Sequence, residues 1–445
     1  MKRAVITICG VLAACSSSNV PASAQPADAE SNVRAQIAAH APYKQWDLVT
    51  GRPSLSIGRT PGAACETISY LIADGRDRGA SSKATELANW VIERQKASTS
   101  LSISGGVAST PDLPAPGNAY HYSIDAAFCA AAMLDMSQAT GRSEYTRSAA
   151  EFGGFLLNMM RDGAGRPIRA GDAGRAPCEA VVQTRSGAPA WNCQHHVKML
   201  VSLPTLKRLD AAFPGKGYAQ AARDIRSTLM PGLEGLWEYS DPEGSRQRWK
   251  RIQGPAGEPD TFVYGDTLAY ALKGLHEYEG PSNDVRRLYA RFSGMRGSNA
   301  RTAAYDGHLA FAGYIRPNGQ AGPEPDQDSA YYDIVTMGLL DAVRRDAAPQ
   351  DAARTMKVLR EQVATRPAIG WHVKFDMSAK TTGTGDISTL AAIGTALATD
   401  RQGARRMTTS SPPVAAPVIP GDVRQETIKI STSEGGMRSR AIPPQ

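Results

Sequence analysis

The sequence lacks the short motifs that mark several large enzyme classes. It has no glycine-rich phosphate-binding loop, no serine nucleophile elbow and no His-Glu-x-x-His metal motif. Among its 445 residues are six cysteines and seven histidines, and none of the cysteine spacings matches a structural zinc site. We therefore expect neither a metal ion nor an organic cofactor, and these absences exclude nucleotide hydrolysis of the P-loop type.

A strong positive charge is also missing from the body of the chain. The net charge is +7, but residues 1–24 carry +2 and residues 401–445 carry +4 of it, which leaves +1 for residues 25–400. Nucleic-acid-binding domains present a clustered excess of Lys and Arg. We therefore expect no nucleic-acid partner.

An apolar run, Ala4 to Ala14, follows two basic residues and is too short to span a bilayer in a mature protein. It predicts a signal peptide. Leu12-Ala13-Ala14-Cys15 resembles the lipobox of bacterial lipoproteins, which implies cleavage before Cys15 and lipidation of its sulfur. Because Ser16 is not Asp, that resemblance implies the outer membrane; Ala22-Ser23-Ala24 is an alternative, ordinary export site. With either site, we expect the body of the protein to leave the cytoplasm for the periplasm or the outer membrane. With the lipobox, which we favour, the lipid on Cys15 is the membrane anchor.

Helical periodicity dominates the rest of the chain, and alternating strand patterns are scarce. We predict a signal peptide at 1–14, a linker at 15–30, one helical domain at 31–400 and a disordered tail at 401–445, whose composition is rich in Ser, Thr, Pro and charge. The predicted helices are 33–48, 64–73, 84–95, 120–140, 143–159, 191–213, 218–239, 261–278, 285–292, 303–314, 329–344, 352–365 and 387–398.

The clearest unit is a helical hairpin formed by 120–140 and 143–159. Gly141 should end the first helix and Ser143 should cap the second. The run Ala-Thr-Gly-Arg-Ser-Glu-Tyr at 139–145 and the residues after it resemble the repeats of α/α-toroid carbohydrate-active enzymes. This resemblance implies an all-α fold, an α/α toroid of helical hairpins with long loops on the cleft face. An open helical solenoid is the alternative.

An even number of cysteines remains after the signal region, in a compartment where disulfides form. Cys178 and Cys193 flank a loop containing Gly and Pro, and we predict that they pair. Cys129 lies in an Ala-rich segment and is either a buried thiol or the partner of Cys65.

The segment Trp191 to Leu200 holds two of the seven histidines beside two carboxamides. If it is helical, Asn192, His195 and His196 share one face. A β-elimination on a uronate needs a group that neutralises the carboxylate, a base at the neighbouring carbon and an acid on the leaving oxygen. The alternative is a purely structural role: the segment is a capped helix start, and its histidines pack among other polar groups.

Toroid alginate lyases place an Asn-His pair on one helix and a Tyr several tens of residues later. This resemblance implies catalytic roles for Asn192, for His195 or His196, and for Tyr264. The sequence departs from that family because Cys193 and Gln194 separate Asn192 from the histidines, so the choice of base stays open. Gln194 is assigned to substrate binding.

Indole and guanidinium groups near these positions suit a uronate chain. Sugars stack on aromatic rings, and Arg pairs with carboxylates. The substrate-binding candidates are therefore Trp191, Trp249, Arg185, Arg246 and Arg248. The leading prediction is a lyase that acts on an acidic polysaccharide.

Two alternatives come from other classes. A glycoside hydrolase needs two carboxyls across the scissile bond, and its candidates are Asp260, Asp266, Asp326 and Asp328, with Asp125 at a further helix start. Each of these acids could equally be a helix cap or a turn residue. The third possibility is a non-catalytic surface lipoprotein built from helical repeats.

Overall fold

The computed structural model describes residues 28–47, 50–55, 58–75, 78–98, 103–111, 119–162, 164–168, 177–183, 189–192, 196–234, 263–294, 314–315, 338–365 and 384–409. The chain divides into two units, residues 1–401 and 402–445, and the description below concerns the first. The predicted signal peptide, the lipidation site Cys15 and the tail from residue 410 lie outside the described residues, as does most of the predicted helix 303–314. Within the described part, no helix is long and apolar enough to cross a membrane.

Helices make up most of the described chain. Their bounds are α1 Ala29–His40, α2 Pro61–Asp74, α3 Arg78–Lys96, α4 Ser123–Thr140, α5 Ser143–Asn158, the 3-10 helix η1 His196–Ser202, α6 Leu203–Ala212, α7 Tyr218–Glu234, α9 Gly265–Glu279, α10 Asn283–Gly294, α13 Asp341–Ala347, α14 Pro349–Thr365 and α15 Ile387–Thr409.

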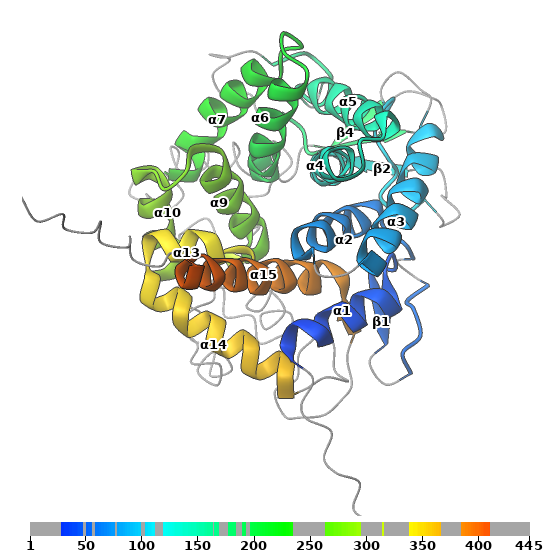
Figure 1. Ribbon diagram of the computed structural model, residues 1–445. Helices are drawn as coiled ribbons and strands as arrows, with labels where there is room; N and C mark the ends of the chain where they lie inside the picture. Colours follow the sequence, from blue (N-terminus) through cyan, green and yellow to red (C-terminus); the bar gives the residue numbers. More distant parts are fainter. Residues whose placement is uncertain are drawn as a thin grey trace, which may run out of the picture. The chain divides into compact units, whose positions relative to one another are not determined.

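The helices form a ring of two layers within the first unit (Figure 1). An inner layer of α2, α4, α6, α9, α13 and α15 is surrounded by α3, α5, α7, α10 and α14, and α1 packs beside α14. The ring closes where α15 meets α2. Gly394 of α15 packs directly against Tyr70 of α2, since a Cβ on Gly394 would lie 2.6 Å from the Tyr70 ring. The predicted α/α toroid is therefore confirmed, and the open solenoid is wrong.

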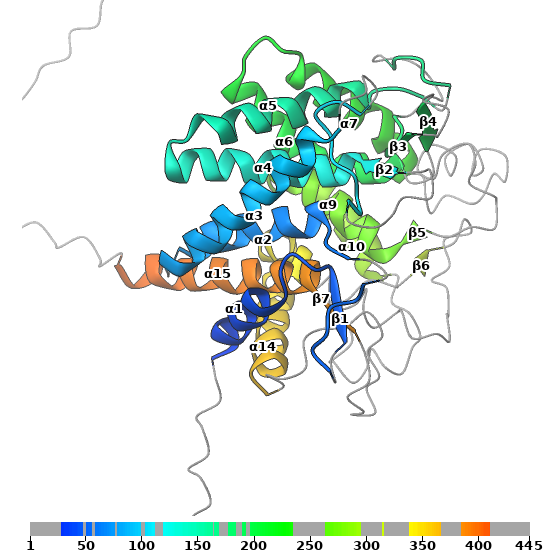
Figure 2. The same cartoon turned by 90° about the vertical axis from the view of Figure 1, so that its right-hand side faces the viewer.

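Short strands lie at one end of the ring (Figure 2). Within the described residues they form three antiparallel sheets, β1–β7, β2–β3–β4 and β5–β6. Strands β2, β5 and β7 run directly into the inner helices α4, α9 and α15, so the N-termini of these helices share the strand end. The strand bounds are β1 Gln45–Asp47, β2 Ala119–Tyr122, β3 Ala180–Gln183, β4 Pro189–Asn192, β5 Val263–Tyr264, β6 Tyr314–Ile315 and β7 Thr384–Asp386.

The hairpin of α4 and α5 shows how the sequence builds the two layers. In α4, small buried residues such as Ala126, Ala127 and Ala130 let neighbouring helices approach closely. In α5, Phe152 and Phe155 are fully buried, and burying each such side chain contributes roughly 1.5–3 kcal/mol to stability. The inner helix is thus buried on more than one face, whereas the outer helix keeps an exposed face.

Two details of this hairpin test the predicted caps. Gly141 ends α4 with φ of 70°, a left-handed conformation that favours glycine, as predicted. The predicted cap at Ser143 is wrong, because Ser143 is the first helical residue and Arg142 holds the N-cap position without a side-chain cap hydrogen bond.

The predicted helix 191–213 is also wrong in its first part. Residues 189–192 form β4, in which Trp191 pairs with Val181 of β3. The α-helix begins only at Leu203, after η1, so Pro204 lies in its first turn, where a missing N–H costs nothing. Similarly, the predicted helix 33–48 ends at His40. Helix α15 extends to Thr409, past the predicted domain boundary at residue 400.

A disulfide between Cys65 and Cys129 joins α2 to α4, which is one of the two alternatives left open by the sequence. Cys178 is also disulfide-bonded; its predicted partner Cys193 lies outside the described residues, so that pairing stays a prediction.

Replacing Cys65 and Cys129 together by alanine is expected to lower the free energy of unfolding. The bridge spans a sequence separation of 64 residues, and closing a loop of that length stabilises a fold by roughly 4 kcal/mol. Denaturant unfolding of the oxidised protein and of the double variant measures the difference. An unchanged unfolding midpoint would contradict the structural role of this bridge.

Candidate functional site

Two carboxyl groups face one cavity at the strand end of the ring. Glu66 lies in the second turn of α2 and Asp125 in the first turn of α4, and both side chains are half-buried. The cavity has a volume of about 290 Å³. Its polar lining consists of Lys44, Gln45, Thr60, Glu66, Ser109, Thr110, Asp125, Tyr270 and Ser388.

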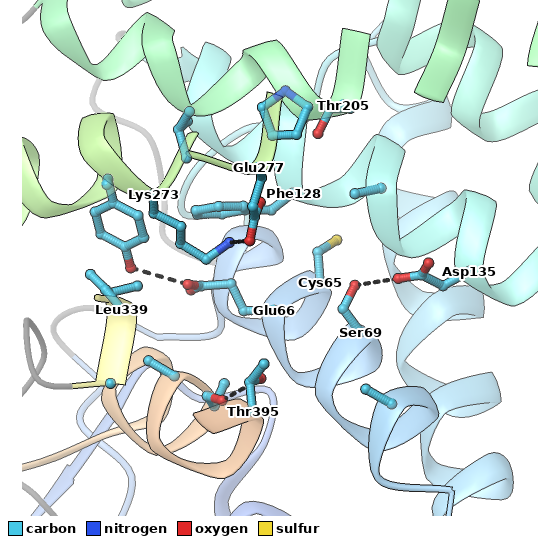
Figure 3. Close-up of a pocket in the computed structure, with 18 of the residues that line it drawn as sticks. Cys65, Glu66, Ser69, Phe128, Asp135, Thr205, Lys273, Glu277, Leu339 and Thr395 are labelled. Atoms are coloured by element: carbon cyan, nitrogen blue, oxygen red, sulfur yellow. Dashed lines mark hydrogen bonds and ion pairs between the residues drawn. The ribbon is translucent and has the colours of Figure 1, made fainter. Parts of the chain in front are cut away.

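Glu66 is held by hydroxyl groups from two other inner helices. The Tyr270 hydroxyl of α9 donates to its Oε1 at 3.1 Å (Figure 3), and the Ser388 side chain of α15 lines the same cavity and lowers the pKa of the carboxyl. Burial raises the pKa of Glu66, although the Lys44 charge and both hydroxyl contacts act in the opposite direction. The carboxyl is thus fixed in position and prone to hold a proton.

Asp125 lies against the N-terminus of α2. A Cβ on Gly62 would come within 2.2 Å of its Oδ1, so the carboxylate occupies the space that the missing side chain leaves. Burial raises the pKa of Asp125 to about 7, with Lys44 lowering it, Glu66 raising it, and both Lys198 and a Ser109 hydrogen bond lowering it. At neutral pH this group is present in both protonation states.

The two carboxyls affect one another's ionisation, since the Glu66 charge raises the pKa of Asp125. Two carboxyls that interact lose their protons in separate steps, so between the two steps one is protonated while the other is ionised. This arrangement can supply a proton donor and an anionic carboxylate to the same cavity. Among the described residues, no group of three or more His, Cys, Asp or Glu side chains is placed to hold a metal ion.

Lys44 forms the cationic side of the cavity. Its Nζ lies 3.3 Å from Oδ2 of Asp386 and 2.6 Å from Oγ of Ser388. Burial lowers the pKa of Lys44, but Asp386, Glu66 and Asp125 together raise it above its ordinary value, so the ammonium stays charged. Asp386 is fully buried and also accepts a hydrogen bond from the Thr389 amide at 2.9 Å, which caps α15.

A second cavity of about 300 Å³ lies further along the same inner helices (Figure 3). It shares Glu66, Phe128 and Tyr270 with the first. Its other polar groups contact each other: the Ser69 hydroxyl donates to Asp135 at 2.7 Å, and Arg208 donates to the other oxygen of Asp135 at 2.6 Å. Glu66 therefore lies between two cavities of the ring interior.

The residues predicted for β-elimination are not assembled on one helix. Asn192 ends β4, His196 opens η1 and Tyr264 lies in β5, so the helical face expected to hold Asn192 with the histidines does not exist. The side chains of these three residues and of Asp266 are not described. The candidates His195, Gln194, Trp249, Arg185, Arg246, Arg248, Asp260, Asp326 and Asp328 lie outside the described residues, and their roles stay predictions.

Trp191 is partly buried and packs against the hydrophobic core. The guanidinium of Arg161 lies over its ring at 5.9 Å from the centroid. A cation therefore lies over one face of the indole that is predicted to stack on a sugar.

Of the acids predicted from sequence, Asp125 lies at this cavity. Glu66, Lys44 and Asp386 are not among the residues predicted from sequence. One signal could have found Glu66, because it is the only charged residue between Pro61 and Ala73 in an otherwise apolar helix. A charge without a neighbour on a buried face is costly unless a partner lies elsewhere in the fold.

Replacing Gly62 by alanine is expected to displace the Asp125 carboxylate, because the added Cβ would lie 2.2 Å from Oδ1. The pKa of Asp125 should then fall below its raised value of about 7, because the carboxyl leaves the buried place that raises it. The matched control is Gly154→Ala in α5, where nothing lies within 4 Å of the new Cβ. Carbon-13 NMR titration measures the Asp125 pKa, and an equal value in the two variants would contradict the placement of Asp125.

Comparisons with known proteins agree on the fold. No protein-family model matches the sequence, and no curated protein matches it significantly. Among solved structures, the chain is similar to a cellobiose 2-epimerase from Bacillus thermoamylovorans B4167 (TM-score 0.54, 11% identity, covering 83% of this chain and 99% of that one). An unsaturated glucuronyl hydrolase specific for heparin (0.53, 11%, 85% and 96%) and a D-mannose isomerase (0.53, 11%, 84% and 97%) are also similar. The chain thus has the α/α-toroid fold of these carbohydrate-active enzymes.

Proposed function

We propose that this protein hydrolyses glycosidic bonds, with Glu66 and Asp125 as its catalytic carboxyl pair. The observation that carries the proposal is the placement of two carboxyls with raised pKa values on one cavity at the strand end of the toroid. Glycoside hydrolysis needs one carboxylic acid and one carboxylate flanking the scissile bond. A pair in which one carboxyl is protonated while the other is ionised provides both.

In this reaction the protonated carboxyl donates its proton to the glycosidic oxygen as the bond to the anomeric carbon breaks. The ionised carboxylate assists the attack on that carbon, either by taking a proton from water or by bonding to the carbon before water releases it. Water adds across the bond, one new reducing end forms, and the pair regains its starting protonation. Tyr270 and Ser388 keep Glu66 oriented during these steps.

The charges of the described lining favour an uncharged sugar over a uronate. Lys44 already faces Asp386 at 3.3 Å, while Glu66 and Asp125 face the cavity. A sugar carboxylate placed there would meet two acids, and like charges at short distance repel. The rings of Phe128 and Tyr270 offer apolar surface for a sugar face. Two of the similar structures, the cellobiose 2-epimerase and the D-mannose isomerase, have names that refer to neutral sugars, whereas the name of the glucuronyl hydrolase refers to a uronate.

A product assay separates this proposal from its competitors. The purified protein is incubated with neutral α- and β-glucans and with uronate polymers, and reducing ends and ultraviolet absorbance are followed. Reducing ends without absorbance support hydrolysis. Absorbance from an unsaturated uronate would support β-elimination, the sequence-based prediction, and a sugar isomer detected by NMR would support neither. No product from any glycan would favour the non-catalytic scaffold.

We further propose that the protein is exported and anchored by lipid at Cys15. The Cys65–Cys129 disulfide supports an oxidising compartment. Metabolic labelling with a palmitate analogue is expected to mark the full chain and to miss Cys15→Ser. Cleavage after Ala24 without labelling would show ordinary export in place of anchoring.

A further inference from the structure

A chain of polar contacts links Lys44 to Glu66. The Lys44 ammonium lies 2.6 Å from Oγ of Ser388. The Ser388 side chain lines the same cavity as Glu66 and lowers the pKa of its carboxyl. Ser388 is 3% exposed, so water does not compete easily for its hydroxyl. Lys44 thus reaches the carboxyl through one intervening side chain.

The direction of these hydrogen bonds follows from the donors available. An ammonium group only donates, and a serine hydroxyl has a single hydrogen. Oγ of Ser388 must therefore accept from Lys44, and its hydrogen is left for Glu66. Together with the Tyr270 hydroxyl at 3.1 Å, Ser388 gives Glu66 two donors whose directions are fixed by other parts of the ring.

Lys44 itself is held firmly at the start of α15. Its backbone carbonyl accepts from the Ile387 amide at 3.0 Å, and Gln45, the next residue, is in register with Asp386. The ammonium lies 3.3 Å from the buried carboxylate of Asp386. Both ends of Lys44 are therefore attached to the same turn that carries Ser388, which leaves the ammonium little freedom to move.

We propose that Lys44 is a positioning residue for Glu66 and acts on it through Ser388. A structural ion pair with Asp386 would need only the ammonium–carboxylate contact. The additional contact with Ser388 orients a hydroxyl that would otherwise rotate, and it fixes the carboxyl that the hydrolysis uses. The effect on rate rests on the proposed function; the effect on Glu66 itself does not.

The charges around both carboxyls define the expected pH response. Glu66 is faced by Lys44, by Tyr270 of α9 and by Asp386 of β7, and Asp125 of α4 lines the same cavity. Asp125 is faced by Lys44, by Glu66 and by Lys198 of η1. Lys44 lowers the pKa of both carboxyls, so loss of its charge should move both limbs of the pH–rate profile to higher pH.

The decisive variants are Lys44→Met, Lys44→Arg and Ser388→Ala. Ser388→Ala keeps the ion pair of Lys44 with Asp386 and removes the hydroxyl that lies between Lys44 and Glu66. We expect kcat to fall about tenfold, the usual effect of losing one hydrogen bond, with KM nearly unchanged. Lys44→Met should lower kcat and shift the profile upward by about one pH unit, as expected for loss of a nearby opposite charge. Lys44→Arg should restore the profile, because it restores the charge.

Lys207→Met is the matched control. Lys207 lies on α6 and donates to the Tyr278 carbonyl at 2.9 Å, outside this contact chain, so rate and profile should stay as in the wild type. If Lys44→Met fails to fold, Ser388→Ala carries the test. Wild-type kcat and pH profile in folded Ser388→Ala would overturn the inference.

A readout other than activity separates this inference from the proposed function. The Glu66 carboxyl can be titrated by carbon-13 NMR, with Glu66→Gln for assignment. If the wild type hydrolyses no glycan, the proposed function fails, and the NMR titration still decides the inference. A Glu66 pKa that is raised in both Ser388→Ala and Lys44→Met supports it, and an unchanged pKa overturns it.

Discussion

Replacing Asp125 by asparagine is expected to lower kcat by about 10³-fold, the middle of the range for loss of a general acid or base. Glu66→Gln should cause a similar loss, because either change leaves the pair unable to be one acid and one anion. The measurement is release of reducing ends from the glycan that the wild type hydrolyses. Asp135→Asn is the matched control: it lies in the same helix α4, but its carboxylate is paired with Arg208 and Ser69. Full activity in Asp125→Asn would refute the carboxyl pair.

The same variant should be more stable than the wild type at alkaline pH. Burial raises the pKa of Asp125 from 3.8 to about 7, so its contribution to stability is complete below pH 4 and is lost as pH rises towards 7. Asparagine does not ionise and avoids this loss. Thermal unfolding at pH 8 should therefore show a higher midpoint for Asp125→Asn, and a lower midpoint would mean that the activity loss reflects damage to the fold.

Rescue experiments assign the two roles. A variant that lacks the acid should keep activity on an aryl glycoside whose leaving group needs no proton. A variant that lacks the base or nucleophile should recover with added azide, which replaces the missing carboxylate. Identical behaviour of Asp125→Asn and Glu66→Gln in both assays would show that neither carboxyl is specifically the acid and neither is specifically the base or nucleophile.

The helices, and the hairpins formed by consecutive helices, could be predicted because they depend on the hydrophobic periodicity and turn residues of short segments. The α4–α5 hairpin follows from 3.6-residue periodicity and from Gly141, all within 36 residues of one another. The prediction of a helix beginning at Trp191 was wrong because the structure of this segment depends on distant residues. Its strand exists because β4 pairs with β3, and this pairing is set by the fold, while the apolar residues after it suit an α-helix and a 3-10 helix alike.

The site could not be predicted from local pattern. Lys44 and Asp386 are 342 positions apart, and no spacing rule connects them with Glu66. Asp125 is a candidate from sequence because it follows a predicted helix start, where its carboxylate could also be a cap. The two adjacent histidines are candidates because histidine is rare in this chain, but the rarity of a residue does not predict what surrounds its side chain. Closure of the ring brings Lys44 next to Asp386 and Ser388, and the cavity exists only because the ring closes.

Ring closure also predicts a large stability effect at Arg401. The sequence predicts a disordered tail from residue 401, yet the Arg401 side chain is only 14% exposed. Its Nη1 lies 2.5 Å from Glu30 of α1, and its Nη2 lies 2.9 Å from Asp74 of α2. Both carboxylates are buried, so one guanidinium connects the first two helices with α15.

Arg401→Met is therefore expected to lower the free energy of unfolding by about 3–5 kcal/mol, the usual result of leaving buried charges without a partner. Arg34 and Arg360 keep longer contacts of 3.7 Å with these acids, which limits the loss. Arg142→Met is the control, because its pair with Glu144 is nearly half exposed and should contribute at most about 1 kcal/mol. Denaturant unfolding compares the two. Equal losses would show that the contacts between α1, α2 and α15 do not depend on Arg401, and the ring would then be closed by apolar packing such as that of Tyr70 against Gly394.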